Sequence, residues 1–247
     1  MNPEENPMIS FVIPTLNEEK YIGKTLDCIS KYHGPHEIIL SDTNSPDKTV
    51  EIAKKYTDKI IIHSKDGKRI TIAAGRNLGA AQAHGEYLVF LDADICILDP
   101  DTFFEKAFAC FRNEPKLVGL TIRLHVFKEL ETFGDRLVIP FFIYVRAFMN
   151  NFLHIGAATG EFQMIKKDAF KQVGGFTESM PVGEDDDLFR RLAKIGRTRL
   201  ELDLVAYHSG RRAHKLGWPK LLYLWTRDTI MIMLFKKPGS KEWTAIR

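Results

Sequence analysis

The segment GEYLVFLDADI, residues 85–95, places an apolar run directly before two aspartates. The run that ends at Leu91 predicts a strand buried on both faces, and α/β folds bind ligands at the carboxyl ends of such strands. Asp92 and Asp94 would repel each other there and lose hydration, so the pattern favours a divalent cation that bridges protein oxygens and a diphosphate. The alternative is that one aspartate only caps the next helix, because short Asp-X-Asp strings also occur by chance.

The first hundred residues alternate short apolar strands with segments of helical periodicity. The apolar runs predict strands at residues 9–13, 37–40, 59–63 and 86–91. The helical spacing predicts helices at residues 18–31, 49–56 and 71–84. Strands that alternate with helices indicate an α/β fold with a single Rossmann-like, mostly parallel sheet flanked by helices and connected by right-handed crossovers.

After Pro100 this alternation is less regular. The pattern predicts helices at residues 101–112, 167–173 and 186–195, and strands at residues 116–126, 161–165 and 198–207. Residues 133–153 form a long apolar segment interrupted by Pro140 and Arg146. With 247 residues and no internal repeat or low-complexity linker, we expect one core followed by a C-terminal extension.

Composition points to a protein made and kept in a reducing cytosol. The three cysteines, Cys28, Cys96 and Cys110, form no C-x-x-C pair, so we expect no disulfide framework. No stretch reaches the roughly 18 to 20 apolar residues of a spanning helix, and the start MNPEENPMIS is acidic, so we expect no signal peptide and a cytoplasmic location.

Charge is unevenly distributed along the chain. The net charge is +3, but residues 208–247 hold nine Lys or Arg and only two acidic residues. Such a basic tail fits a solvated surface, a phosphate-binding element or a patch that attracts anionic lipid. Composition does not choose among these three.

Polar residues follow the first two predicted strands as well. In IPTLNEE, Thr15 or Asn17 could cap the next helix, and Asp47 in SDTNSPDKT could do the same. Asp42 comes directly after an apolar strand, where a carboxylate can accept from a base N–H or a ribose hydroxyl. Arg76 in AGRNLGAA could lie over a pyrophosphate or a base, whereas tight packing explains the glycines but not the arginine.

Two later clusters carry further candidates. The acids of GEDDDLFRRL, residues 184–187, would favour a helix start, but four exceed what a cap needs, so one could act as a general base. In HSGRR, His208 is either a metal ligand or a surface histidine. Arg211 and Arg212 could hold phosphate oxygens in bidentate fashion, which suits a diphosphate leaving group.

These motifs together resemble family 2 glycosyltransferases. The motifs IPTLNEE, DTNSPDKT, GRNLG, FLDAD, GGF and GEDDDLFRRL occur in the order and spacing of that family over residues 8–210. The resemblance implies a GT-A fold, a nucleotide-diphosphate-sugar donor, one divalent cation (Mn or Mg), and inverting transfer of the hexosyltransferase class. It also implies a nucleotide-binding half to about residue 98 and an acceptor half at 99–210. The basic, aromatic-rich residues 211–247 would follow as a helical C-terminal extension.

Carried over by position, the resemblance assigns roles to the candidate residues. Asp185 would be the catalytic base, Asp94 would bind the metal that bridges the diphosphate, and His208 matches a less uniform position that sometimes joins the metal. The donor-binding residues would be Pro14, Thr15, Asn17 and Glu18 around the nucleoside, Asp42 at the base, Arg76 at the nucleotide, and Asp92 near the ribose. A UDP-sugar is the favoured donor, with a GDP-sugar next.

The acceptor is less defined. The aromatic-rich apolar segments 137–149 and 218–235 fit buried core, a homodimer interface, or peripheral attachment to the inner face of the cell membrane with a lipid-linked acceptor. That acceptor would place the enzyme in glycan or glycolipid synthesis, and we expect no nucleic-acid partner.

Two other functions compete with sugar transfer. A sugar nucleotidyltransferase should carry a Gly-rich phosphate loop with a basic residue after the first strand, which IPTLNEE lacks. An inactive nucleotide-sugar-binding protein would be expected to have lost Asp92, Asp94 or Asp185, and all three are present.

Overall fold

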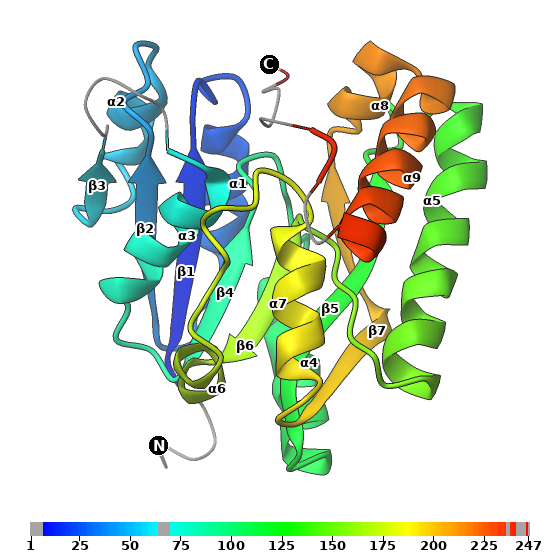
Figure 1. Ribbon diagram of the computed structural model, residues 1–247. Coiled ribbons are helices and arrows are strands. Elements are labelled where there is room, and N and C mark those ends of the chain that lie inside the picture. Colours follow the sequence, from blue (N-terminus) through cyan, green and yellow to red (C-terminus); the bar gives the residue numbers. More distant parts are fainter. Residues whose placement is uncertain (1–6, 64–69, 236–237, 241–245, 247) are drawn as a thin grey trace.

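A computed structural model describes residues 7–63, 70–235, 238–240 and 246. Its centre is a seven-stranded sheet (Figure 1). The strands are β1 (Ile9–Thr15), β2 (His36–Asp42), β3 (Ile60–Ile62), β4 (Tyr87–Leu91), β5 (Leu117–Val126), β6 (Phe162–Lys166) and β7 (Arg197–His208). They lie in the order β3-β2-β1-β4-β6-β5-β7.

The sheet is mostly parallel, as predicted. Strands β1 to β4 pair in parallel, and so do β5 and β7. Strand β6 runs antiparallel to both β4 and β5. It therefore starts beside the end of β4, where the backbone N–H of Asp92 donates to the carbonyl oxygen of Glu161 at 3.1 Å. This places the segment before β6 next to the predicted Asp-X-Asp pair.

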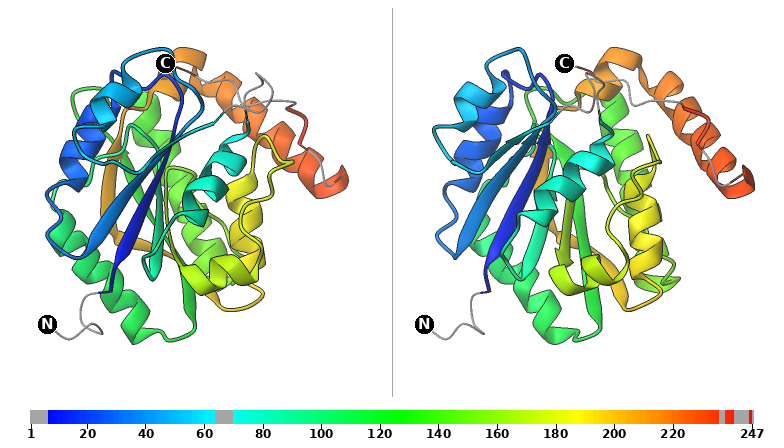
Figure 2. Two further views of the ribbon diagram at one scale, coloured as in Figure 1. Left: turned by 90° about the vertical axis from the view of Figure 1, so that its left-hand side faces the viewer. Right: turned by 60° about the vertical axis from the view of Figure 1, so that its left-hand side comes forward.

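Helices cover both faces of the sheet (Figures 1 and 2). One face carries α1 (Ile22–Ile29), α2 (Thr49–Ala53), α4 (Pro100–Asn113) and α5 (Phe133–Ala147), and the other carries α3 (Ile72–Ala81), α6 (Lys167–Gln172) and α7 (Glu184–Leu192). Alternate strand residues supply the two cores: Phe11 and Ile13 of β1 face α1 and α4, while Val12 faces α3.

Several element bounds differ from the predicted ones for local reasons. The first helix begins at Ile22 rather than residue 18, because Asn17 has a left-handed backbone (φ 55°) that turns the chain out of β1. The apolar segment 133–153 forms α5, with Pro140 inside it, followed by a π-helical turn η1 (Phe148–Phe152).

The C-terminal extension is helical up to Phe235. It contains α8 (Arg211–Leu216) and α9 (Trp218–Phe235), which lie beside α5 in Figure 1, and α9 reaches away from the sheet in Figure 2. The basic residues at 236, 237, 241 and 247 of the predicted tail, and the acidic start at residues 1–6, lie outside the described residues. Among the described helices, none combines the length and apolar character needed to cross a bilayer.

The expectation of no disulfide was wrong. Cys28 of α1 and Cys96, which follows β4, form a disulfide with Cα atoms 5.5 Å apart. The two cysteines are separated by 68 residues, so sequence spacing carried no signal, and only the packing of α1 against the end of β4 brings them together. The bond anchors the chain two residues beyond Asp94, and Cys110 remains a free thiol.

Candidate active site

A cavity of about 1540 Å³ lies at the carboxyl ends of β1 and β4. Ligand pockets for drug-sized molecules span about 300–1,000 Å³, so this cavity has room for more than one small molecule. Ten of the twelve predicted site residues line it: Pro14, Thr15, Glu18, Arg76, Asp92, Asp94, Asp185, His208, Arg211 and Arg212. Residues as far apart in the chain as Pro14 and Arg212 are brought together because the parallel strands end at one edge of the sheet.

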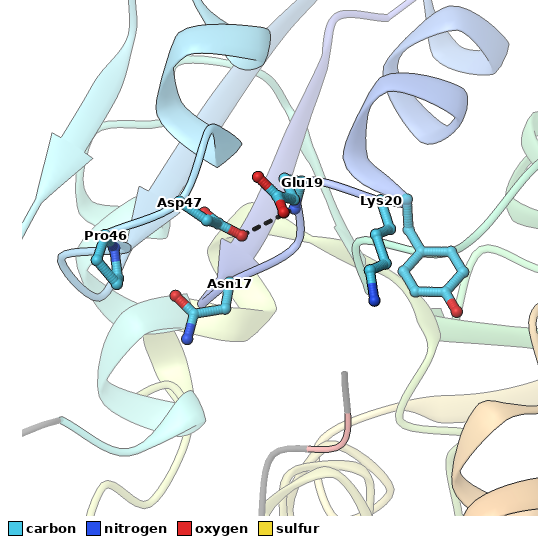
Figure 3. A pocket seen from close by; sticks show the side chains of 6 residues that line it. Asn17, Glu19, Lys20, Pro46 and Asp47 are labelled. Carbon is cyan, nitrogen blue, oxygen red and sulfur yellow. Dashed lines mark hydrogen bonds between the residues drawn. The ribbon is translucent and has the colours of Figure 1, made fainter.

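Asn17, which was predicted to line the nucleoside pocket, lies instead in a smaller pocket of about 330 Å³ (Figure 3). This pocket is formed by the loop after β1 and the loop after β2, and the N–H of Glu19 donates to Asp47 across it at 3.2 Å. The N–H of Asn17 donates to Ser45 Oγ at 2.8 Å. The left-handed turn at Asn17 thus directs its side chain away from the larger cavity wall.

Asp42, predicted to contact the base, is fully buried and does not line the larger cavity. Its carboxylate accepts from Thr15 Oγ1 and from the N–H and hydroxyl of Ser45, each at 2.7 Å. In this structure Asp42 therefore ties the end of β2 to the end of β1. Its contact with a base stays a prediction.

Arg76 joins three segments that are distant in sequence. It lies on α3 with 1% of its surface exposed, and it donates to Asp92 Oδ1 at 3.0 Å, to Glu184 Oε1 at 3.1 Å and to the carbonyl oxygen of Gly160 at 2.7 Å. A buried guanidinium needs such partners to offset its lost hydration. Arg76 thus holds the end of β4 and the start of α7 together, and its predicted contact with the nucleotide stays a prediction.

Three of the four acids at the start of α7 have partners from other parts of the fold or from their own helix. Glu184 pairs with Arg76. Asp186 accepts from the N–H of Ala158 at 3.0 Å. Asp187 pairs with Arg191 at 2.8 Å. These three carboxylates therefore stabilise the local structure.

Asp185 differs from its neighbours. In the described part of the chain its carboxylate accepts one hydrogen bond, from the N–H of Asp186 at 2.9 Å, and the residue lines the cavity. Burial, followed by the charges of Glu184 and Asp186, raises the pKa of Asp185 well above its ordinary value of 3.8, although Arg76 and Arg146 lower it. A carboxylate with a raised pKa is a stronger base for a proton at neutral pH.

Because Gly160 has no side chain, it leaves room for the carboxylate of Asp185. A Cβ atom on Gly160 would lie 2.8 Å from Asp185 Oδ2, closer than real Cβ contacts allow. A glycine at this position therefore permits the close approach of the loop before β6 to the start of α7.

The two aspartates after β4 have different surroundings. Asp94 accepts from the hydroxyl of Ser209 and lies 3.3 Å from Arg211 Nε, while Arg211 also binds Glu18 through two bonds of 2.6 and 2.9 Å. Burial raises the pKa of Asp92 to about 7 despite the opposing charge of Arg76, with smaller increases from Glu161 and Asp94. The Asp94 end of the cavity thus combines a carboxylate with a cationic side chain.

Asp94 and His208 are the candidate ligands for a divalent cation at this end of the cavity. Within the residues that the structure describes, no three His, Cys, Asp or Glu side chains form a group that could enclose a metal ion. Mg²⁺ usually binds one or two carboxylates, substrate phosphates and several waters rather than an all-protein cage. Asp94 supplies such a carboxylate; His208 lines the same cavity, with its Nδ1 accepting from the N–H of Gly210 at 3.3 Å.

Sequence reasoning missed three residues of this site. Gly160 and Ser209 gave no signal of their own, since their roles depend on Asp185 and Asp94 lying opposite them. Arg146 did give a signal, because it is a charge within an apolar segment. It lines the cavity, and its Nε donates to the carbonyl oxygen of Ala158 at 2.8 Å.

The fold is of the GT-A type: the sheet is mixed and mostly parallel, carboxylates gather at the ends of β1 and β4, and the solved structures that superpose on it are GT-A glycosyltransferases. The sequence profile of glycosyl transferase family 2 matches residues 10–174, so the chain belongs to this family.

Relatives and solved structures agree with this assignment. The chain is 35% identical over 98 residues to an uncharacterized glycosyltransferase of Haemophilus influenzae, a match that spans 36% of each protein. The mannosyltransferase PcManGT from Pyrobaculum calidifontis, solved with GDP-Man and Mn²⁺, superposes with a TM-score of 0.68 at 19% identity, covering 87% of this chain and 61% of that one. TarS 1-349 of Staphylococcus aureus, solved with UDP-GlcNAc, superposes with a TM-score of 0.59 at 21% identity, covering 81% and 58%. The chain thus spans less than two thirds of each of these proteins.

Proposed function

We propose that the protein is an inverting, metal-dependent glycosyltransferase that moves a sugar from a nucleotide-diphosphate donor to an acceptor hydroxyl. The observation that carries this proposal is the position of Asp185. It lines the same cavity as Asp94 and Arg211, and it is the acid of the α7 cluster whose carboxylate is not engaged by another segment within the described residues. Inverting transfer requires a base for the acceptor hydroxyl and, in the same cavity, groups that bind the leaving diphosphate.

The base at one end of the cavity and the diphosphate-binding residues at the other define the steps of the transfer. Asp185 removes the proton from the acceptor hydroxyl, and the resulting oxygen attacks the anomeric carbon from the face opposite the diphosphate. The new glycosidic C–O bond forms as the bond from that carbon to the diphosphate oxygen breaks, so the configuration inverts and the electron pair leaves with the diphosphate.

Positive charge is available where the leaving group develops negative charge. A bound Mn²⁺ or Mg²⁺, held by Asp94 and with His208 as a second candidate, would stabilise the leaving diphosphate. Arg211 and Arg212 line the same cavity. Burial lowers the pKa of Arg212 to about 10, which leaves it cationic at neutral pH.

The donor class is supported by solved structures of the same fold. PcManGT was solved with GDP-Man and TarS with UDP-GlcNAc, so this fold accommodates both bases. For this chain we propose a UDP-sugar first and a GDP-sugar second.

The test uses two neighbouring aspartates. Release of nucleoside diphosphate is measured for UDP-, GDP- and dTDP-sugars with Mn²⁺, with Mg²⁺ and with EDTA, and donor binding is measured by thermal shift. We expect Asp185→Asn to abolish transfer and keep donor binding, whereas Asp186→Asn, which preserves the acceptor for the Ala158 N–H, keeps both.

Two outcomes would contradict the proposal. Loss of donor affinity equal to the loss of rate in Asp185→Asn would remove the base role. Inorganic pyrophosphate released from a nucleoside triphosphate and a sugar phosphate would indicate a sugar nucleotidyltransferase, and a thermal shift without turnover would indicate an inactive nucleotide-sugar-binding protein.

The outer face of α5 supports peripheral attachment to a membrane. The side chains of Phe133, Leu137, Phe141, Tyr144, Phe148 and Phe152 recur at helical spacing with exposed fractions from 53% to 82%. We name these six residues the α5 stripe. Ile143 and Ala147 of the same helix are buried, so segment 137–149 is core on one side only. An exposed apolar stripe fits binding to the inner face of a membrane that carries a lipid-linked acceptor, and the exposed Lys215 of α8 and Lys220 of α9 would favour anionic lipid.

Liposome sedimentation tests this attachment. We expect the protein to sediment with anionic liposomes at low salt, and Phe141→Ser to weaken sedimentation. A homodimer formed through the same stripe would instead dissociate in Phe141→Ser without lipid, which sedimentation velocity would detect. Failure to sediment at low salt would contradict membrane attachment.

A further inference from the structure

The larger cavity has a second, apolar half away from the diphosphate end. It lies between α5 and α9, which are neighbours in Figure 1 and touch through Phe142 and Trp225, whose ring centres are 5.3 Å apart. We name this part of the cavity the α5–α9 groove. Its wall includes Ile139, Phe142, Ile143, Leu221, Leu224 and Trp225.

The aromatic side chains of the groove contact one another and are only partly buried. The rings of Trp225 and Trp218 lie 6.0 Å apart at 73°, and Trp218 Nε1 donates to Asp135 at 3.0 Å, which fixes its orientation. Phe142, Leu224 and Trp225 are half-buried, so they expose apolar surface within the cavity. Apolar surface in a water-filled cavity favours an apolar ligand, because binding removes that surface from water.

Arg146 connects this groove to the proposed base. Its guanidinium lies 5.7 Å from the Phe142 ring centre, and its Nε donates to the carbonyl oxygen of Ala158, whose N–H donates to Asp186 next to Asp185. The groove therefore begins close to the carboxylate that would take the acceptor proton. A ligand with a hydroxyl at Asp185 can extend directly along α5 toward Trp225.

We infer that the α5–α9 groove binds the hydrocarbon chain of an amphipathic acceptor, whose hydroxyl-bearing head lies at Asp185. This inference rests on the proposed function and names the acceptor class. A purely polar acceptor would leave the aromatic wall in contact with water. The α5 stripe on the opposite side of the same helix fits an acceptor that arrives from a lipid surface, with α5 lying between the membrane and the reaction site.

Chain-length dependence tests the groove directly. The probes are methyl, hexyl and decyl β-glycosides of several common sugars, used below their micelle concentrations with the donor found active in the screen. We expect KM to fall about twofold to fourfold for each methylene that enters the groove, the change that partial to full burial of a CH₂ produces. Rates extrapolated to saturation should change little.

Adjacent phenylalanines on α5 provide a matched pair of variants. Phe142 lines the groove, whereas Phe141 belongs to the exposed α5 stripe. We expect Phe142→Ala to remove most of the preference for decyl over methyl glycosides, and Phe141→Ala to retain it. A donor-induced thermal shift in both variants shows that each is folded.

A direct binding measurement separates this inference from the proposed function. In a Trp243→Phe background, only Trp218 and Trp225 remain. A decyl glycoside brominated near the chain end should quench their fluorescence saturably, in Asp185→Asn as well as in the active protein. Quenching without transfer from any donor would support the groove and overturn the proposed reaction.

Three results would contradict the proposal that the groove binds a hydrocarbon chain. Transfer to methyl and decyl glycosides with equal KM, or the absence of saturable quenching, would show that the groove does not hold a hydrocarbon chain, while the transfer itself would stand. Equal loss of chain preference in Phe141→Ala and Phe142→Ala would likewise contradict it.

Discussion

Replacement of Arg76 by methionine should strongly destabilise the fold. Arg76→Met keeps much of the side-chain volume but removes the positive charge that Asp92 and Glu184 share. It also removes the donor to the carbonyl oxygen of Gly160. Both carboxylates would then lose the counter-charge that offsets their burial, and the pKa of Asp92, already about 7, would rise further.

The size of the effect follows from the exposure of each partner. Breaking a buried ion pair by removing one member costs about 3–5 kcal/mol. The Asp92 side chain is 30% exposed and can regain water from the cavity, whereas that of Glu184 is only 10% exposed and bears most of the cost. With about 1 kcal/mol for the lost hydrogen bond to Gly160, we expect the free energy of unfolding to fall by about 4 kcal/mol. In a domain of this size, that loss lowers Tm by about 8–16 °C.

Urea unfolding followed by far-UV circular dichroism at pH 7.5 measures the loss. Arg136→Met is the control, because Arg136 pairs with Glu131 at the surface, and exposed pairs contribute little. The deficit of Arg76→Met should shrink as pH falls. Without Arg76 the folded-state pKa of Glu184 rises further above its unfolded value, so the penalty is present at high pH and is relieved as the carboxylate takes up a proton.

Two results would refute this reasoning. A loss below about 1 kcal/mol at pH 7.5 would mean that water replaces the guanidinium at little cost. A deficit that does not decrease toward pH 5 would mean that the loss comes from packing rather than from the two carboxylates.

Three further predictions concern the same cavity and its support. Burial raises the folded-state pKa of Asp185, so the stability present while this carboxyl is protonated is lost as pH rises and the carboxyl ionises. Asp185→Asn should therefore increase Tm at pH 8 and change it little at pH 4, as followed by calorimetry. A lower Tm at pH 8 would contradict the raised pKa. Gly160→Ala should reduce kcat about 100-fold with unchanged donor binding, since it displaces the Asp185 carboxylate, and a normal kcat would show that this loop can move aside. Reduction of the Cys28–Cys96 bond should cost about 4 kcal/mol of unfolding free energy, as expected for a loop of 68 residues, and the Cys28→Ser/Cys96→Ser variant should match the reduced protein in its Tm.

Much of the fold was predictable because its signals are local. The apolar run before Asp92 has the length of a strand, and helical spacing alternates with it through the first hundred residues. The start of α1 was misplaced because the left-handed turn at Asn17 depends on the hydrogen bond that its N–H donates to Ser45, which is distant in sequence. The antiparallel direction of β6 also had no local signal, since strand direction depends on the path of the connecting chain.

The sequence predicted which residues form the site better than it predicted the contacts that these residues make. Ten of the twelve predicted residues line one cavity, because strands in a parallel arrangement deliver their ends to one edge. The distinction of Asp185 from Glu184 and Asp186 came only from the family resemblance, whereas the structure supplies a physical reason in the partners of the other acids. Asp42 and Asn17 face other parts of the structure because the two loops that hold them bind to each other.

The sequence by itself determined which residue types stand at the strand ends, because apolar periodicity sets the strands and the polar residues follow them directly. It thereby specified the sheet, the Asp-X-Asp pair and the acidic start of α7. Only the tertiary structure decided which α7 carboxylate is not bound by another segment of the described chain, that Cys28 meets Cys96, and that α5 turns one apolar face to the cavity and another outward. These features depend on contacts between segments far apart in the chain, and such contacts leave no periodic trace in the sequence.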